Sequence, residues 1–189
     1  MLLMMEKSWF SKIFSRSEEV QPRAPQLEAD CTEADAQFRR GLNFASGAGV
    51  PRDYGQAAQW YRKAAEQNHA LAQFNLGVMY SKGQGVVRDD AQAAAWFGLA
   101  ANLGDAGAQY NLGRICQRAS MDGPAAGAVE ARIEAYKWYQ LAAAQGYQHA
   151  DGAYASLTPK MTRADVAEAN QRVARFAPVA APKPLLAAG

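Results

Sequence analysis

One stretch of this sequence recurs at a fixed spacing, and that spacing limits the folds open to the chain. The segment AlaLeuAlaGlnPheAsnLeuGly at 70–77 returns as AlaGlyAlaGlnTyrAsnLeuGly at 106–113 and, in a shorter form, as AlaAspAlaGlnPhe at 34–38. The offset is 36 positions both times. A fixed period of about 20 to 50 residues is typical of solenoids, whose units bury their apolar faces by stacking. The sequence therefore predicts a repeat array.

Each unit has the pattern of two short helices joined by a turn. In the central unit, Gly83 ends the first helix and Asp89 suits the N-cap of the second. The apolar spacing of the first helix is carried by Ala70, Ala72, Leu76 and Tyr80, and the packing face of the second comprises Ala93, Ala94, Trp96, Phe97, Ala100 and Ala101. Trp96, the central tryptophan of the array, is expected to be a core residue. We therefore predict an all-α fold, an α/α solenoid of stacked helix-turn-helix repeats.

These residues resemble the pattern of the Sel-one-like repeat family, a branch of the tetratricopeptide-like helical solenoids. The matching residues of the central unit are Ala70, Ala72, Leu76, Gly77, Tyr80, Gly83, Gly85, Val86, Asp89, Ala93, Trp96, Ala100 and Ala101. The resemblance implies a tetratricopeptide-like superhelix in a bacterial protein that binds other proteins. A likeness of fold does not by itself assign a function.

The flanking units depart from this pattern at identifiable places. Arg40 stands where Leu76 and Leu112 stand, a change that a terminal unit can tolerate because it is covered on one side only. In the third unit six extra residues lie near 118–132, and we expect them to lengthen the loop between the two helices. Cys116 takes the Tyr80 position, as expected for a small buried apolar side chain.

The repeats predict the following organisation of the chain. Residues 1–16 form an amphipathic helix and 17–33 a linker. The solenoid spans 34–176, with units at 34–69, 70–105 and 106–147 and a partial, capping unit at 148–176 whose last helix has Thr162 as its N-cap. The proline- and alanine-rich tail at 177–189 is expected to be disordered. We expect a monomer.

The amphipathic segment at 1–16 has two interpretations. Its apolar side chains Trp9, Phe10, Ile13 and Phe14 fall on one helical face, with basic residues around them. Such a helix can cap the first repeat, or it can make weak, reversible contact with an anionic membrane surface, such as the inner membrane. Charged residues arrive too early for a secretory signal or a membrane span.

Composition excludes several classes of protein. Twenty basic residues against 18 acidic ones provide no strongly basic face, so nucleic-acid binding is not expected. The two cysteines, Cys31 and Cys116, match no zinc or redox spacing. They are therefore expected to be free thiols in a reducing compartment, which favours the cytoplasm.

No catalytic constellation is visible in the sequence. His69 and His149 lie in predicted turns without a third metal ligand or a nucleophile motif nearby, so we expect surface or capping histidines. We expect no cofactor and no metal. An enzyme of unknown type stays an alternative, disfavoured because the recurring positions serve packing.

Binding is the remaining route to a function. In related tetratricopeptide solenoids the first helix of each hairpin lines a concave groove, and the resemblance transfers that role by register to Phe38, Arg39, Leu42, Phe74, Asn75, Val78, Tyr110, Asn111 and Arg114. The predicted groove also includes Lys82 and Arg118, basic residues that the repeat pattern leaves free. Amide side chains suit the backbone of an extended peptide. The aromatic members can instead pack between hairpins, and the basic members can form a solvated face. The sequence favours a non-enzymatic adaptor that binds a protein or peptide.

Overall fold

The computed structural model describes residues 32–123 and 125–178. Within these ranges the chain is helical and has no β-strand, which confirms the predicted all-α fold. The helices are α2 (Glu33–Ser46), α3 (Tyr54–Glu66), α4 (Ala70–Lys82), α5 (Asp90–Asn102), α6 (Ala106–Asp122), α7 (Ala125–Ala144), α8 (Ala150–Leu157), the 3-10 helix η2 (Thr158–Lys160) and α9 (Arg163–Arg175). The expectations for residues 1–31 and for the tail beyond 178 lie outside the described residues.

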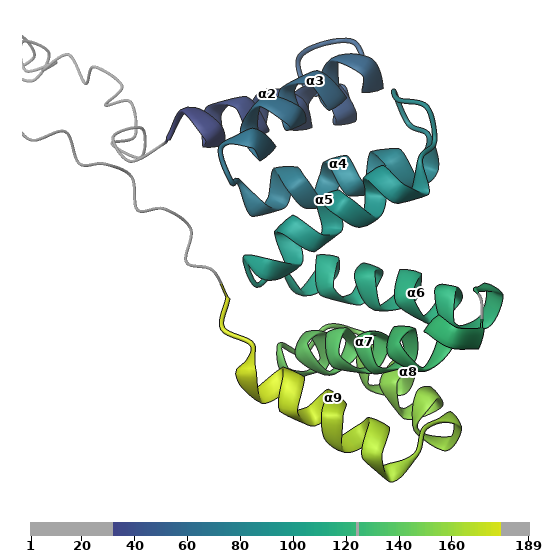
Figure 1. The fold of residues 1–189 in the computed structure, drawn as a ribbon. Coiled ribbons are helices and arrows are strands. Elements are labelled where there is room, and N and C mark those ends of the chain that lie inside the picture. Colours follow the sequence, from purple (N-terminus) through teal and green to yellow (C-terminus); the bar gives the residue numbers. More distant parts are fainter. Residues whose placement is uncertain (1–31, 124, 179–189) are drawn as a thin grey trace, which may run out of the picture. The chain divides into compact units, whose positions relative to one another are not determined.

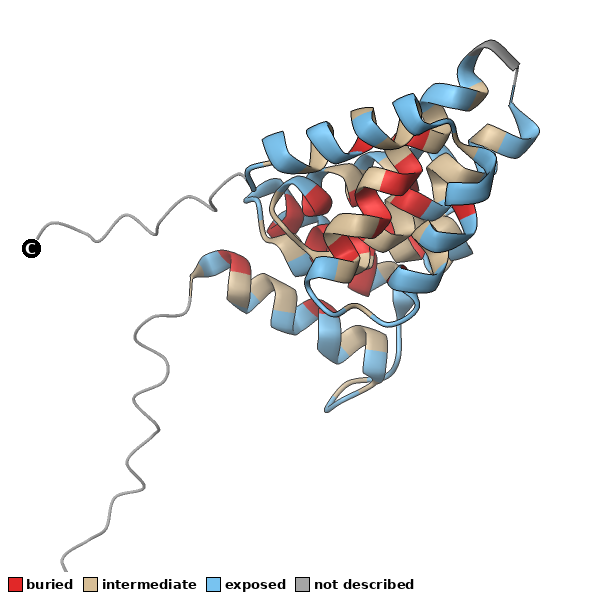
Figure 2. Ribbon diagram, turned by 90° about the horizontal axis from the view of Figure 1, so that it is seen from below, coloured by how far each residue is buried: buried red, intermediate tan, exposed pale blue. Residues whose placement is uncertain are grey.

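The helices stack in the order of the chain (Figure 1). Pairs of antiparallel neighbours, α2 with α3, α4 with α5 and α6 with α7, form three hairpins, and each second helix packs on the first helix of the next hairpin. Both α8 and α9 pack on α7. This arrangement confirms the α/α solenoid. Figure 2 shows that buried residues lie on the helix faces that meet, while exposed residues cover the outside.

The ends of the helices follow the local sequence. Asp89 is the N-cap of α5, and its Oδ1 accepts hydrogen bonds from the backbone N–H groups of Ala91 and Gln92 at 2.9 Å. Thr162 caps α9 in a reciprocal capping box with Asp165. Gly83 ends α4 at a φ of 67°, in the left-handed region. The predicted boundaries of these helices are therefore confirmed.

In each hairpin a glycine of the first helix lies against an aromatic ring of the second. A Cβ atom added to these glycines would lie 2.5, 2.8 and 2.7 Å from a ring carbon, closer than carbon atoms pack. The rings are 3, 2 and 1% exposed. The pairs are Gly41 with Tyr61, Gly77 with Phe97, and Gly113 with Tyr139. The glycine therefore sets how closely the two helices of a hairpin approach.

The largest core residue of α5 is Phe97, not Trp96. Phe97 is 2% exposed, whereas Trp96 is only partly buried, at the edge of the core cluster that α3 and α4 form. The reason is the helical step of about 100° per residue, which turns Trp96 away when Phe97 is seated on Gly77. Both residues belong to the predicted packing face, but Phe97 lies in the core and Trp96 only at its edge.

Buried glutamines tie each hairpin to the one before it. The Nε2 atom of Gln73 donates to the carbonyl oxygen of Ala65 at 3.0 Å, and that of Gln109 donates to the carbonyl of Ala101 at 3.2 Å. Both glutamines are 1% exposed. Each bond gives a second donor to a carbonyl in the last turn of a second helix, which already accepts a backbone N–H from the turn that follows.

The acceptor side of these glutamines is satisfied unequally. Gln145 donates to Oε1 of Gln109 at 2.9 Å, and Gln67 donates to Gln37 in the same way in the first hairpin. In the second hairpin the equivalent donor position is Leu103, and Oε1 of Gln73 is buried without a hydrogen-bond partner. An unpaired buried carbonyl oxygen costs free energy, so the second hairpin is not at its optimum.

The extra residues of the third unit extend helices instead of a loop. Helix α6 has 17 residues and α7 has 20, against 13 each in α4 and α5. The prediction of a longer loop was therefore wrong. Alanine-rich sequence such as 125–131 favours helix strongly, and the added turns of α7 carry Glu130, which binds α9.

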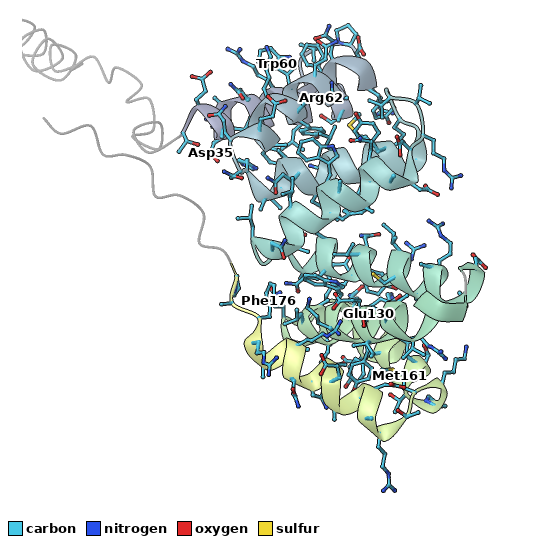
Figure 3. All side chains as sticks on the ribbon, viewed as in Figure 1. Asp35, Trp60, Arg62, Glu130, Met161 and Phe176 are labelled. Atoms are coloured by element: carbon cyan, nitrogen blue, oxygen red, sulfur yellow. The ribbon has the colours of Figure 1, made fainter. Side chains whose placement is uncertain are left out.

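The last helix is held on α7 by an ion-pair cluster and an aromatic contact. Arg172 of α9 donates to Glu134 at 2.7 Å, to Glu168 at 2.9 Å and also to Glu130. Phe176 lies edge-on to Trp138, with ring centroids 5.6 Å apart. Glu130 and Phe176 are labelled in Figure 3, on the side of the solenoid where α7 and α9 meet. These contacts cover the end of the third hairpin.

We predict that alanine is tolerated very differently at two turn glycines. Gly85 and Gly49 have φ angles of 70° and 74°, so alanine at either should cost about 1 kcal/mol in backbone strain. A Cβ atom on Gly85 would also lie 2.2 Å from the carbonyl of Tyr54, whereas none of the described atoms lies within 4 Å of one on Gly49. Gly85→Ala should therefore lower the free energy of unfolding by about 3 kcal/mol or more. Denaturant melts measure the difference, and equal losses would contradict the packing of this turn on α3.

We also predict that Leu103→Gln stabilises the protein. The new amide can donate to the buried Oε1 of Gln73, as Gln145 does to Gln109. One hydrogen bond to a buried acceptor should add about 1 kcal/mol to the free energy of unfolding. The matched control is Gln67→Leu, which should remove the equivalent bond to Gln37 and lower stability. A destabilised Leu103→Gln variant in the same melts would refute the argument.

Candidate functional site

The aromatic residues predicted for the groove pack between hairpins. Phe38 lies 5.7 Å from Tyr61 of its own hairpin and stacks at 4.5 Å on His69 of the next one. Phe74 lies 5.8 Å from Phe97 and also contacts the start of α6. Tyr110 lies between two rings, 5.4 Å from Tyr139 and 5.2 Å from Tyr147. Each ring is half-buried, and it packs both on a ring of its own hairpin and on the segment that follows that hairpin.

Four of the predicted groove residues line one cavity of about 460 Å³ between the second and third hairpins. It lies between the end of α4, the start of α5 and one face of α6. We call it the basic pocket. The predicted residues in it are Lys82, Asn111, Arg114 and Arg118, and the other lining residues are Ser81, Arg88, Asp90, Ala93, Phe97, Ile115, Gln117 and Met121.

The positive charge of the basic pocket is only partly compensated. Its lining holds four cationic side chains and one carboxylate, that of Asp90. Arg88 donates to both oxygens of this carboxylate at 3.3 and 3.2 Å, and Arg118 donates to Oδ2 at 3.3 Å. The hydrogen bonds from Arg88 hold the pKa of Asp90 below its usual value. Within the described part of the chain, neither Lys82 nor Arg114 makes an ion pair.

The floor of the basic pocket is apolar. Phe97 and Ala93 are almost fully buried and line it from α5, while Ile115 lines it from α6. Asn111 donates its Nδ2 hydrogen to the carbonyl oxygen of Gly107 at 2.8 Å, which orients the amide group. A ligand in this pocket would meet an apolar surface under a rim of cations.

The remaining predicted residues do not line the basic pocket. Leu42 is 40% exposed on α2, and Arg39 is exposed beside it. On α4, Asn75 is half-buried, and Val78 packs against the core cluster that α5, α6 and α7 form. Whether these residues bind a ligand stays a prediction.

The prediction from sequence missed two charged residues of the pocket, Arg88 and Asp90. Arg88 lies in the turn before α5, and Asp90 is the first residue of α5, which is a second helix. A register argument confined to first helices could not include them. The charge run ArgAspAsp at 88–90 was the available signal, but only Asp89 was given a role, that of the N-cap.

Outside the basic pocket, His69 has a structural role. His69 is the N-cap of α4, with Nδ1 accepting from the backbone N–H of Ala72 at 3.2 Å and Nε2 lying 3.2 Å from Asp35, so the expected capping role is confirmed. In the described ranges no group of three or more His, Cys, Asp or Glu residues could hold a metal ion. No helix of those ranges is long and apolar enough to span a membrane.

Comparison with known proteins places this helical-repeat protein in a family. A model of the Sel1 repeat matches residues 34–69, 70–105 and 106–147. The chain therefore belongs to the Sel1 repeat family, as the resemblance implied. Repeats of this family are generally scaffolds for protein–protein interaction and are generally not catalytic.

Solved structures of two bacterial proteins share the fold. A Sel1 repeat protein from Oxalobacter formigenes is 34% identical over 62% of this chain and 46% of its own, with a TM-score of 0.54. A protective antigen present in uropathogenic Escherichia coli strains, which displays the Sel1-like repeat fold, is 33% identical over 75% of this chain and 30% of its own, with a TM-score of 0.52. The alignments thus span less than half the length of either relative. A search of curated proteins found no match.

We predict that Cys116 reacts slowly with alkylating reagents. Burial, with a further contribution from Glu134, raises the pKa of its thiol to about 11. The raised pKa should lower its thiolate fraction at pH 8 about 100-fold relative to an exposed cysteine, because the thiolate is the nucleophile. The Cys31→Ser variant isolates this thiol, and iodoacetamide labelling followed by mass spectrometry measures its rate. A rate equal to that of N-acetylcysteine would contradict the buried placement.

Proposed function

We propose that this protein is a non-enzymatic adaptor whose first helices, α2, α4 and α6, form a groove that binds a protein or peptide. It acts as a monomer in the bacterial cytoplasm. The groove comprises the eleven residues predicted for it from the sequence together with Arg88 and Asp90. Its centre is the basic pocket, where the second and third hairpins meet.

The basic pocket is the observation that carries this proposal. Stacking buries most of the surface where hairpins meet, but here a cavity of about 460 Å³ stays open to solvent. Its rim includes Lys82 and Arg114, which make no ion pair within the described residues. Cationic groups over an apolar floor suit a polypeptide, which carries charged and apolar side chains in alternation. Half-buried Asn75 lies one repeat before Asn111 and extends the groove along α4.

The amphipathic segment at 1–16 supports a second proposal. It would place the adaptor at the inner membrane through weak, reversible contact with anionic lipid. The alternative role of this segment, a cap on the first repeat, stays a prediction beside it, since these residues lie outside the described part of the chain. Neither role changes the binding surface proposed for the repeats.

We predict that obstructing the first-helix face abolishes capture of the partner. Asn75→Arg puts a long side chain into the groove without altering the basic pocket itself. The tagged full-length protein should capture a partner from native lysate, identified by mass spectrometry, and the Asn75→Arg variant should lose it by about tenfold or more. The purified partner then gives the dissociation constants by calorimetry.

The matched control is Gln59→Arg, the same kind of change on the exposed face of the second helix α3. It should leave capture unchanged. Both variants are checked for an unchanged melting temperature, so that loss of binding is not loss of fold. Equal capture by the wild type and Asn75→Arg, or stoichiometric retention of a small molecule with no protein partner, would overturn the adaptor proposal.

A further inference from the structure

The carboxylate of Asp90 occupies the basic pocket in the way that a ligand's carboxylate would. It joins Arg88, in the turn before α5, to Arg118 on the neighbouring hairpin. The three side chains are 45 to 63% exposed. Exposed ion pairs contribute little to stability because water and salt screen them. An incoming carboxylate can therefore replace Asp90 at little cost to the fold.

The other cations of the pocket are arranged to hold further carboxylates. Arg114 and Arg118 are four residues apart on α6, so they project from the same face. Lys82 faces them from the end of α4 across the cavity. The guanidinium groups can bind carboxylates through paired hydrogen bonds. The pocket thus offers several cationic positions and fills one of them with a carboxylate of its own.

The apolar floor narrows the class of ligand. Phe97 and Ile115 lie beneath the cations, and Met121, at 63% exposed, extends the apolar surface at the rim. A small inorganic anion would leave this surface uncovered. An extended peptide with acidic side chains on either side of an apolar one would cover the floor and meet the cations together.

We propose that the basic pocket binds an acidic segment of a partner protein, an apolar side chain flanked by Asp or Glu, and that Asp90 is the internal occupant which this segment displaces. The inference rests on the proposed adaptor function and names the chemistry of its partner. Nucleic acid is the weaker ligand class, since the chain has a net charge of only +2 and the cations are grouped at one cavity instead of along a phosphate track.

The test measures binding of fluorescein-labelled peptides to the full chain by anisotropy. One peptide alternates glutamate and leucine, and its matched control has glutamine in place of glutamate. We expect the acidic peptide to bind at least about tenfold more tightly than its control, because glutamine cannot form the charge-assisted hydrogen bonds of glutamate. Its affinity should fall as salt is added. Arg114→Gln should also lower the affinity of the acidic peptide by about tenfold.

Asp90→Asn provides the outcome that a merely structural role would not produce. Removing the internal carboxylate should tighten binding of the acidic peptide by about threefold or more, and misfolding cannot cause tighter binding. Asp89 keeps its N-cap in this variant. The charge-matched control for Arg114→Gln is Arg163→Gln, at an exposed position at the start of α9, and this variant should leave binding unchanged.

Several results would overturn the inference. The inference is wrong if the two peptides bind with equal affinity, or if Asp90→Asn binds the acidic peptide more weakly than the wild type does. It is also wrong if Arg163→Gln and Arg114→Gln lower the affinity equally, or if an oligothymidylate of the same length binds more tightly than the acidic peptide through the same arginines. If the acidic peptide fails while Asn75→Arg still abolishes capture of a protein from lysate, the inference falls and the adaptor function stands. If both experiments fail, both proposals fall.

Discussion

In every hairpin of this solenoid a glycine on the first helix touches an aromatic ring on the second. A Cβ atom at Gly77 would lie 2.8 Å from Phe97, and the equivalent distances in the flanking hairpins are no longer. The absence of a side chain lets the helices approach until the ring is nearly excluded from water, which recovers the free energy of burying a large apolar surface. The approach also brings the alanines of the second helix, such as Ala100 at 0% exposed, into the core. A single hairpin still leaves one face uncovered, so this contact prepares a unit that must stack.

Stacking uses polar as well as apolar contacts, and the basic pocket is a consequence of it. Gln73 and Gln109 bind carbonyl groups of the preceding hairpin, which fixes the register of one unit on the next. Phe97 has two roles: it packs on Gly77 within its own hairpin, and it lines the floor of the basic pocket toward α6. The Asp90–Arg118 pair spans the same junction at the surface. The proposed ligand would therefore contact two units at once, and their spacing would be part of its recognition.

The end of the array is closed by chemistry that differs from the repeats. Arg172 is surrounded by carboxylates of α7 and α9, and they raise the pKa of its guanidinium. Trp138, which is 6% exposed, is covered by Phe176 and by the ammonium group of Lys137, 4.0 Å from the ring centroid. The equivalent Trp60 is covered by the cations of Arg40 and Lys63. Arg40, which departs from the repeat pattern, is exposed and places its guanidinium over the Trp60 ring at 4.9 Å. The terminal units thus replace a missing apolar neighbour with a cap or with a cation.

The sequence by itself determined the period, the all-α class and the boundaries of the capped helices, because caps such as Asp89 and left-handed ends such as Gly83 depend on a few adjacent residues. Only the tertiary structure ranked the two aromatic residues of the predicted packing face of α5, with Phe97 in the core and Trp96 at its edge, since neighbours in sequence face different directions. The extra residues near 118–132 have a local reason to be helical, since 125–131 is rich in alanine, but the contact of Glu130 with α9 depends on the tertiary structure. The candidate site, too, was predictable from the sequence only in part. The spacing of four residues on α6 places Arg114 and Arg118 on one face, but the meeting of Arg118 with Asp90, 28 residues earlier, required two hairpins to stack.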